Sequence, residues 1–164
     1  MTSNGWRSLL ITLIATAATG CGPGPADGDD AEVAQEITRQ SFSEFGDYVV
    51  HYNALATEML PPEVARAYGI QRSENRAMLN ISVLRKEAGT IGQPVAAKVQ
   101  VDASNLTGQL KSVDIRQIEE GRAIYYIGEV GVANRETLIF DISVQPEGES
   151  EAFRVRFRQQ FYSS

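Results

Sequence analysis

The sequence predicts an all-β domain, and three observations support that prediction. After Phe45, seven segments alternate apolar and polar residues or are rich in β-branched residues, with Gly, Pro, Asn and Asp between them. One apolar side per segment is typical of two sheets packed face to face. After Ala77 no helix of crossover length fits between segments, which excludes parallel βαβ units. We therefore expect an antiparallel seven-strand immunoglobulin-like sandwich with one short helix between the first two strands; a partly open barrel is the alternative.

The expected strands are 47–55, 77–86, 95–103, 109–118, 123–130, 137–145 and 152–162. In 95–103, every second residue from Val95 to Val101 is apolar and the residues from Lys98 to Asp102 on the other side are polar. The segment 137–145 repeats this pattern, with Leu138 to Val144 on the apolar side. Each of these strands therefore has one buried face.

The expected helix lies in the segment 60–69, between the first two strands. Proline starts the turn, Glu63 suits the positive N-terminal end, and Gly69 can adopt the left-handed conformation that ends a helix. Its apolar side, which is expected to cap one end of the sandwich, consists of Val64, Ala67 and Tyr68.

Residues 1–20 have the features of an export signal. A short head carries Arg7 and no acid, and the apolar run 9–15 and small residues follow it. The apolar run is shorter than the roughly 20 residues that a membrane-spanning helix needs. We therefore expect removal of this segment rather than a membrane span.

The sequence Ala18-Thr19-Gly20-Cys21 resembles the lipobox of bacterial lipoproteins, although Ala18 stands where that family most often has Leu. The resemblance implies cleavage before Cys21 and acylation of its sulfur and new amino group, for example with palmitate. Two or three acyl chains together form a stable membrane anchor. Gly22 follows where Asp would resemble the inner-membrane retention signal, which favours the outer membrane, facing the periplasm. The alternative is an ordinary signal peptide cut after Ala17, with Cys21 left as a free thiol.

The segment 21–44 is expected to be an acidic flexible tether ahead of a β-sandwich domain at 45–164. Gly, Pro and Asp dominate its first residues, so it lacks the apolar surface that folding requires. Seven acids and one base lie between Asp27 and Asp47, whereas 14 acids and 13 bases follow, so the net charge of −6 comes from the tether. A short helix over 31–41 is possible, because Val33, Ala34 and Ile37 have helical spacing.

Two stretches resemble a small family of uncharacterised proteobacterial envelope proteins that consist of a single domain of unknown function. They are His51-Tyr52-Asn53 and the segment 60–77 (LPPEVARAYGIQRSENRA), followed by Asn80-Ile-Ser-Val. The resemblance extends from about Phe45 to Tyr162. It implies a one-domain exported protein, and no reaction or ligand.

Motifs for catalysis and cofactor binding are absent from the sequence. It has no Gly-x-Ser-x-Gly elbow, no phosphate-binding Gly-x-x-x-x-Gly-Lys and no His-Glu-x-x-His motif, and it has only one His and one Cys. We expect no metal, no cofactor and no enzymatic activity. The net charge of −6 argues against nucleic-acid binding, which requires clustered Lys and Arg.

His51 is the best candidate for proton transfer. It shares a side of its strand with Val49, Asn53 and Leu55, close to the loop 72–76. The alternative to a general base or pH-sensing contact is a cross-strand hydrogen bond.

Arg154, Arg156 and Arg158 alternate with apolar residues in the last strand, so three guanidinium groups stand about 7 Å apart along one face. They can bind phosphate or carboxylate groups. Alternatively they pair across the sheet with Asp141 or Glu136 and discourage edge-to-edge aggregation.

These features favour a lipid-anchored, non-catalytic module that binds an envelope protein or a cell-wall component. The candidate contact surfaces are Arg154, Arg156 and Arg158, or His51 with Arg72 and Arg76. The alternatives are a small periplasmic enzyme that uses His51 and a carrier of an apolar ligand between the sheets.

Overall fold

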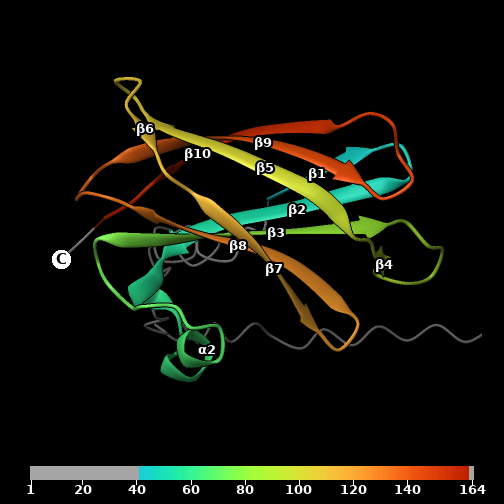
Figure 1. The fold of residues 1–164 in the computed structure, drawn as a ribbon, viewed down its shortest axis with the longest axis horizontal. Coiled ribbons are helices and arrows are strands. Elements are labelled where there is room, and N and C mark those ends of the chain that lie inside the picture. The colour runs from blue at the N-terminus through green and yellow to red at the C-terminus, as the bar shows by residue number, and fades with distance from the viewer. Residues whose placement is uncertain (1–40, 163–164) are drawn as a thin grey trace, which may run out of the picture. The chain divides into compact units, whose positions relative to one another are not determined.

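A computed structural model describes residues 41–162, which form two antiparallel β-sheets packed face to face (Figure 1). The larger sheet has the strand order β1-β2-β3-β8-β7, with β4 also paired to β3. Its strands are β1 (Ser41–Phe45), β2 (Tyr48–Ala56), β3 (Arg76–Arg85), β8 (Ala123–Gly131), β7 (Asp114–Glu120) and β4 (Gln93–Pro94). The smaller sheet has the order β10-β9-β5-β6, made of β10 (Phe153–Gln160), β9 (Thr137–Pro146), β5 (Ala97–Asn105) and β6 (Leu110–Lys111). The predicted all-β sandwich is confirmed.

The core lies between the sheets and consists of the side chains that the period-two patterns placed inside. Leu79 and Ile81 of β3 and Phe140 of β9 are fully buried, and the outward residues of β5 and β9 are polar for most of their length. Each fully buried side chain of this size contributes about 1.5–3 kcal/mol through loss of apolar surface from water. The alternation along these strands is therefore the main stabilising feature of the fold.

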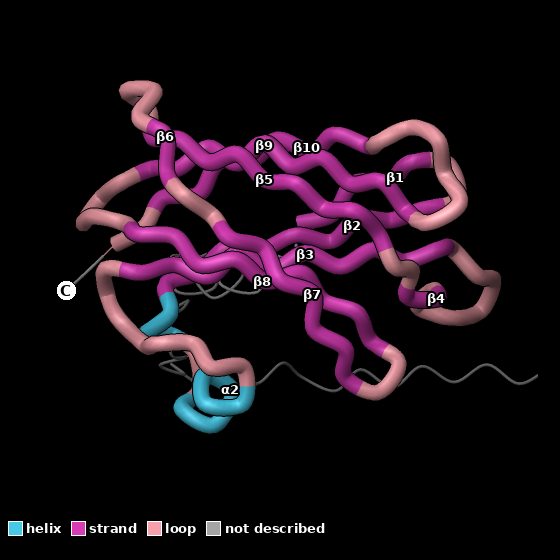
Figure 2. Tube along the Cα trace, viewed as in Figure 1, coloured by secondary structure: helices cyan, strands magenta, loops and turns pink. Residues whose placement is uncertain are grey.

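Two elements differ from the predicted strand list. Residues 41–44, assigned to the tether, belong to β1, which pairs with β2 across a turn in which Gly46 has φ +54°. The predicted strand 109–118 is divided, because β6 pairs with β5 of the smaller sheet and β7 pairs with β8 of the larger sheet (Figure 2). The chain therefore crosses between the sheets within that segment. Residues 1–40, and with them the predicted signal, Cys21 and the possible helix over 31–41, lie outside the described residues.

The helix α2 (Pro62–Ala67) follows a single 3-10 turn, η1 (Thr57–Met59), and its proline start and Gly69 stop (φ +63°) are as predicted. The position of α2 differs from the predicted one. It covers part of the outer face of the larger sheet instead of an end of the sandwich, and Ala65 is buried there while Ala67 is exposed. The reason is a second apolar cluster formed by the outward residues Met78 and Ile127 with Leu60, Ala65 and Ile70. Among residues 41–162, no helix has the length and apolar character that crossing a membrane requires.

Candidate functional site

The outward side of the smaller sheet gathers the predicted arginines into a regular array. Strand register places the residues of β10, β9 and β5 in rows across the sheet. We call this surface the arginine face; its rows are Arg154–Ser143–Gln100, Arg156–Asp141–Asp102 and Arg158–Ile139–Ser104. The face therefore combines cationic, anionic and neutral polar groups within three strands.

The sequence of β10 fixes the direction of these arginines. Phe153, Val155 and Phe157 point into the sandwich, and Val155 is only 4% exposed. Because successive side chains in a strand point to opposite sides, the three guanidinium groups must point outward. All three arginines are exposed.

Only the middle arginine of the three has an acidic partner. Arg156 Nε lies 3.5 Å from Asp141 Oδ1, and both side chains are about half or more exposed. Arg154 stands across from Ser143 and Arg158 across from Ile139, and neither makes an ion pair or side-chain hydrogen bond with any residue in 41–162. The predicted pairing with Asp141 is thus made by Arg156 alone.

Glu136, the other predicted partner, is engaged elsewhere. Its carboxylate lies 2.8 Å from Lys111 Nζ and accepts hydrogen bonds from the Ala133 N–H and from Asn105. Burial alone would raise the pKa of Glu136, but the hydrogen bonds from these three groups outweigh it and lower the pKa below the ordinary value. Glu136 therefore stabilises the β8–β9 turn and does not neutralise the arginine face.

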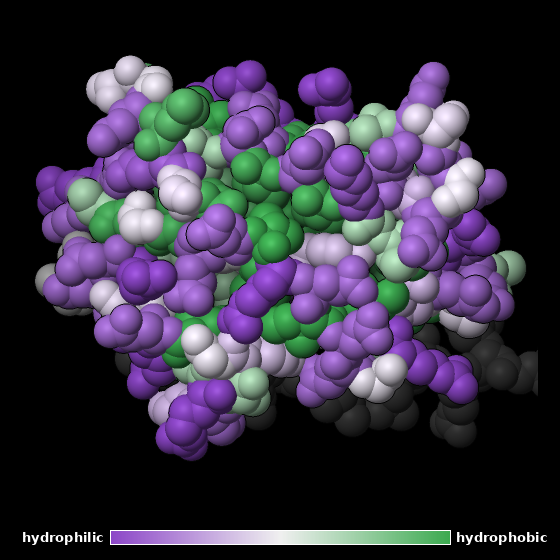
Figure 3. All heavy atoms as spheres, in the orientation of Figure 1, coloured by the Kyte–Doolittle hydropathy of each residue, from purple (hydrophilic) through white to green (hydrophobic). Residues whose placement is uncertain are grey.

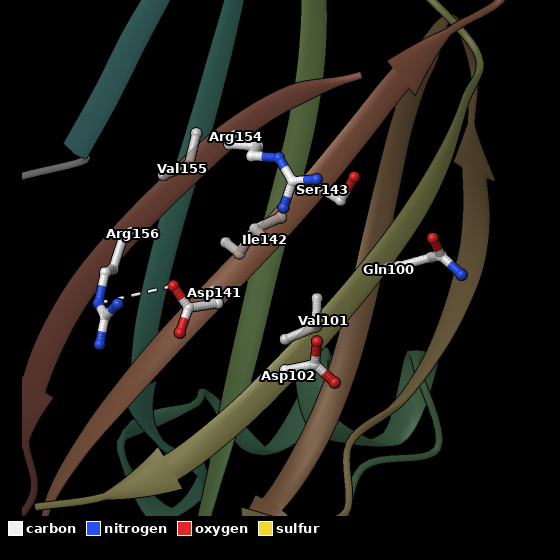
Figure 4. A pocket seen from close by; sticks show the side chains of 9 residues that line it. All are labelled: Gln100, Val101, Asp102, Asp141, Ile142, Ser143, Arg154, Val155 and Arg156. Atoms are coloured by element: carbon white, nitrogen blue, oxygen red, sulfur yellow. Dashed lines mark ion pairs between the residues drawn. The ribbon is translucent and has the colours of Figure 1, made fainter. Parts of the chain in front are cut away.

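A hollow of about 450 Å³ lies on the arginine face (Figure 4). Residues of β5, β9 and β10 line it, with Arg154 and Arg156 on one side and Gln100 and Asp102 on the other. Figure 3 shows one face of the molecule, on which polar side chains surround smaller apolar areas. The hollow offers guanidinium, carboxylate, amide and hydroxyl groups together, which is a composition suited to a polar ligand.

His51 lies on the opposite side of the molecule, on the outer face of the larger sheet. It stands across from Ser82 of β3, and its ring centroid is 5.9 Å from that of Phe42. Its Nδ1 atom and the Oδ1 atom of Asn80 are buried without a hydrogen-bond partner. No hydrogen bond joins His51 to Ser82 among the described residues, so the structure shows no assembled nucleophile and base.

The structure separates His51 from the arginines with which it was grouped. Arg76 lies six residues before Ser82 in β3, about 20 Å along the strand. Arg76 forms an ion pair with Glu129 at 3.3 Å, and Arg72 donates to the backbone carbonyl of Glu58 at 2.6 Å. Arg76 and His51 therefore share the outer face of the larger sheet but lie at opposite ends of β3, and both Arg72 and Arg76 already have partners in the described part of the chain.

Sequence reasoning missed Ser143, Gln100 and Asp102 as neighbours of the arginines. The period-two pattern shows that each points outward, but only the strand order β10-β9-β5 brings them beside β10. No local signal in the sequence gives that order.

Comparison with known proteins places this chain in a family. Residues 42–164 match the family described as Domain of unknown function (DUF4426). The chain belongs to the DUF4426 family. This agrees with the resemblance found in the sequence to a single-domain uncharacterised family. No curated protein matches the chain.

A solved structure of a DUF4426 family protein from Pseudomonas aeruginosa PAO1 has 34% sequence identity and a TM-score of 0.64, and the match covers 76% of this chain and 95% of that one. FetP from uropathogenic Escherichia coli strain F11, expressed in the periplasm, has 10% identity and a TM-score of 0.53, covering 76% and 94%. A copper-bound variant of FetP gives 10% identity, a TM-score of 0.55 and coverage of 76% and 95%. Because the identity is only 10%, these matches show that FetP and the DUF4426 domain have the same fold and nothing about a shared function.

The copper in that variant belongs to FetP. In the described part of this DUF4426 chain, no three or more His, Cys, Asp or Glu side chains come close enough together to hold a metal ion.

Proposed function

We propose that this DUF4426 protein is a non-catalytic binding module, held at the periplasmic side of a membrane by lipid on Cys21. It binds an envelope protein or a cell-wall component through the arginine face. The observation that supports the proposal is the absence of acidic partners for Arg154 and Arg158 within residues 41–162.

The chemistry of arginine supports a ligand with carboxylate or phosphate groups. A guanidinium group presents several N–H donors in a planar fork that matches these anions with two parallel hydrogen bonds. Arg154 and Arg158 are four residues apart, about 13 Å along β10, so one extended ligand can contact both. The interaction strengthens where the ligand also excludes water from the hollow beside Arg154.

A pair of double variants tests this proposal in intact cells. Arg154→Ala/Arg158→Ala removes both unpaired guanidinium groups, and Arg66→Ala/Arg122→Ala removes two exposed arginines from α2 and from the β7–β8 turn. Both changes alter net charge equally and leave the core intact. After chemical crosslinking of the cell envelope, we expect the adducts of the native protein to disappear in the first variant and persist in the second. Equal retention of the adducts in both variants would rule out the arginine face.

A further inference from the structure

β10 is the terminal strand of the smaller sheet, and one of its edges is free. Its whole ladder, from Phe153 to Gln160, is made with β9. Among residues 41–162 the backbone groups on the other edge make no backbone hydrogen bond, and only the Gln159 side-chain amide reaches one carbonyl, that of Gln160. An eight-residue edge with unpaired N–H and C=O groups is a template for another strand.

The charges on β10 decide which strand fits. A second copy of β10 would place guanidinium groups beside guanidinium groups, and like charges on neighbouring strands repel. An added strand that carries carboxylates on its outward side would instead face Arg154 and Arg158, which lack acidic partners in the described part of the chain. The free edge therefore favours an acidic partner and disfavours self-pairing.

The ion pair between Arg156 and Asp141 limits the positions at which the partner strand needs acids. Because Asp141 already faces Arg156, an acid opposite Arg156 would meet a neutralised site. The acids are needed opposite Arg154 and Arg158 only, which are four residues apart and point to the same side. The partner strand thus carries acids at positions i and i+4 and a neutral residue at i+2.

The inward side of the edge favours apolar residues at positions i+1 and i+3. Phe153 stacks on Phe45 of β1 with centroids 4.7 Å apart, and Phe157 lies 4.8 Å from Tyr52 of β2. All four rings are only half-buried, so apolar surface remains uncovered between the edges of the two sheets. Apolar side chains of an added strand would cover that surface.

We propose that the partner of this protein is an extended protein segment with acids at i and i+4 that adds as a strand to the free edge of β10. This inference rests on the proposed function and names the class of ligand. The backbone of β10 supplies affinity, and Arg154 and Arg158 select the acidic pattern.

The test uses two nine-residue synthetic peptides of identical composition, added to the full chain labelled with nitrogen-15. One peptide has Glu at positions 3 and 7, and the other has Glu at positions 4 and 6, with Val and Thr elsewhere. We expect the first peptide to bind about two- to fivefold more tightly at low salt, because only its acids reach both unpaired arginines at once. We also expect slower hydrogen exchange at the alternate β10 amides that do not donate to β9.

Charge reversal provides the matched control. Arg154→Glu/Arg158→Glu should reverse the preference, so that a peptide with Lys at positions 3 and 7 binds and the acidic peptide does not. Equal binding of both acidic peptides, or binding without slower exchange in β10, would overturn the proposal. So would slow exchange of those amides before any peptide is added, since the edge would then be occupied by a second copy or by another part of the chain.

The two proposals fail separately. If the Arg154→Ala/Arg158→Ala variant loses its cellular adducts but the peptides leave β10 exchange unchanged, the arginine face binds its partner without strand addition. If the peptides add to β10 but the cellular adducts do not depend on these arginines, the proposed function fails, while strand addition of acidic segments to β10 is supported.

Discussion

Thr57 shows how one buried polar group positions a whole segment. It is fully buried, and its Oγ1 accepts a hydrogen bond from the Ser73 N–H at 2.9 Å and donates to the carbonyls of Gln71 or Ser73. These bonds hold the loop after α2 against the start of the helical segment. No periodic pattern in the sequence marks this residue.

We expect Thr57→Val to destabilise the fold by about 1–3 kcal/mol, because it removes the partner of the part-buried Ser73 N–H and the fully buried hydroxyl that bonds the loop carbonyls. Urea denaturation measures the change. Thr137→Val is the matched control, since the structure gives the Thr137 side chain no hydrogen bond, and its effect should stay within about 0.5 kcal/mol. Similar losses in both variants would show that the hydrogen bonds of Thr57 do not stabilise the loop.

Glu136 links folding stability to pH. Since its pKa in the folded state is lowered, its ionised form stabilises the fold above the unfolded-state pKa, near 4.5, and this stabilisation is lost as the pH falls through the folded-state value. We expect Glu136→Gln to cost about 1–3 kcal/mol at pH 7 and clearly less at pH 3. Denaturation at both pH values checks this, with the exposed Glu151→Gln as control. If Glu136→Gln lowered the free energy of unfolding by the same amount at pH 3 and pH 7, the stabilising role of the ionised carboxylate would be contradicted.

At the scale of elements, the packing of the residues that lead into β7 against the neighbouring strand β8 depends on a glycine. A Cβ atom at Gly128 of β8 would lie 2.6 Å from Ile115 Cδ1 and 2.7 Å from Val113 Cγ1. Such distances require the side chains at the start of β7 to move. The segment 112–115 is where the chain passes from the smaller sheet to the larger one, so this contact fixes the crossover.

We expect Gly128→Ala to destabilise the fold by about 1–3 kcal/mol through overpacking. Gly131→Ala, in the same strand, meets no atom within 4 Å and should be neutral or slightly stabilising. Thermal denaturation of the two variants distinguishes them. Equal melting temperatures would mean that the β7 side chains adjust at no cost.

The sequence predicted those elements whose periodicity is local and missed those that depend on pairing. β5, β9 and β10 were predicted because each has a clear apolar side facing the core. β1 was missed because its five residues lie beside an acidic, Gly-rich stretch and look like part of the flexible tether. Its stability comes from pairing with β2 and from the contact between Phe45 and Phe153. The alternation of residues in β10 predicted that the arginines point outward. The partners of Arg156 and Glu136 could not be predicted in this way, because they depend on strand order and turn geometry.

At the scale of the whole chain, the folded domain and its attachment are separate features. The domain carries two outward sheet faces with different chemistry, one with the arginines and one with His51, Asn80 and Phe42. The proposed attachment depends on Cys21, which precedes the domain. A lipid anchor restricts partners to molecules near the membrane and makes recognition by an exposed face the expected mode of action.

We expect radiolabelled palmitate to be incorporated into the native chain and not into Cys21→Ala, since the sulfur is the first site of acylation. Mass spectrometry of the native protein should show a chain that begins at Cys21 and carries lipid. Labelling that persists in Cys21→Ala, or an unmodified thiol in the native protein, would refute the anchor.

The most direct test of recognition compares the two faces within living cells. A photoreactive amino acid at Ser143, beside Arg154, probes the arginine face, and the same amino acid at Ser82, opposite His51, probes the other face. Both serines are half-buried in the middle of a sheet, so the substitutions are matched. We predict a light-dependent adduct of defined mass from position 143 and none from position 82. An adduct from position 82 alone would contradict this account and move the binding surface to the His51 face.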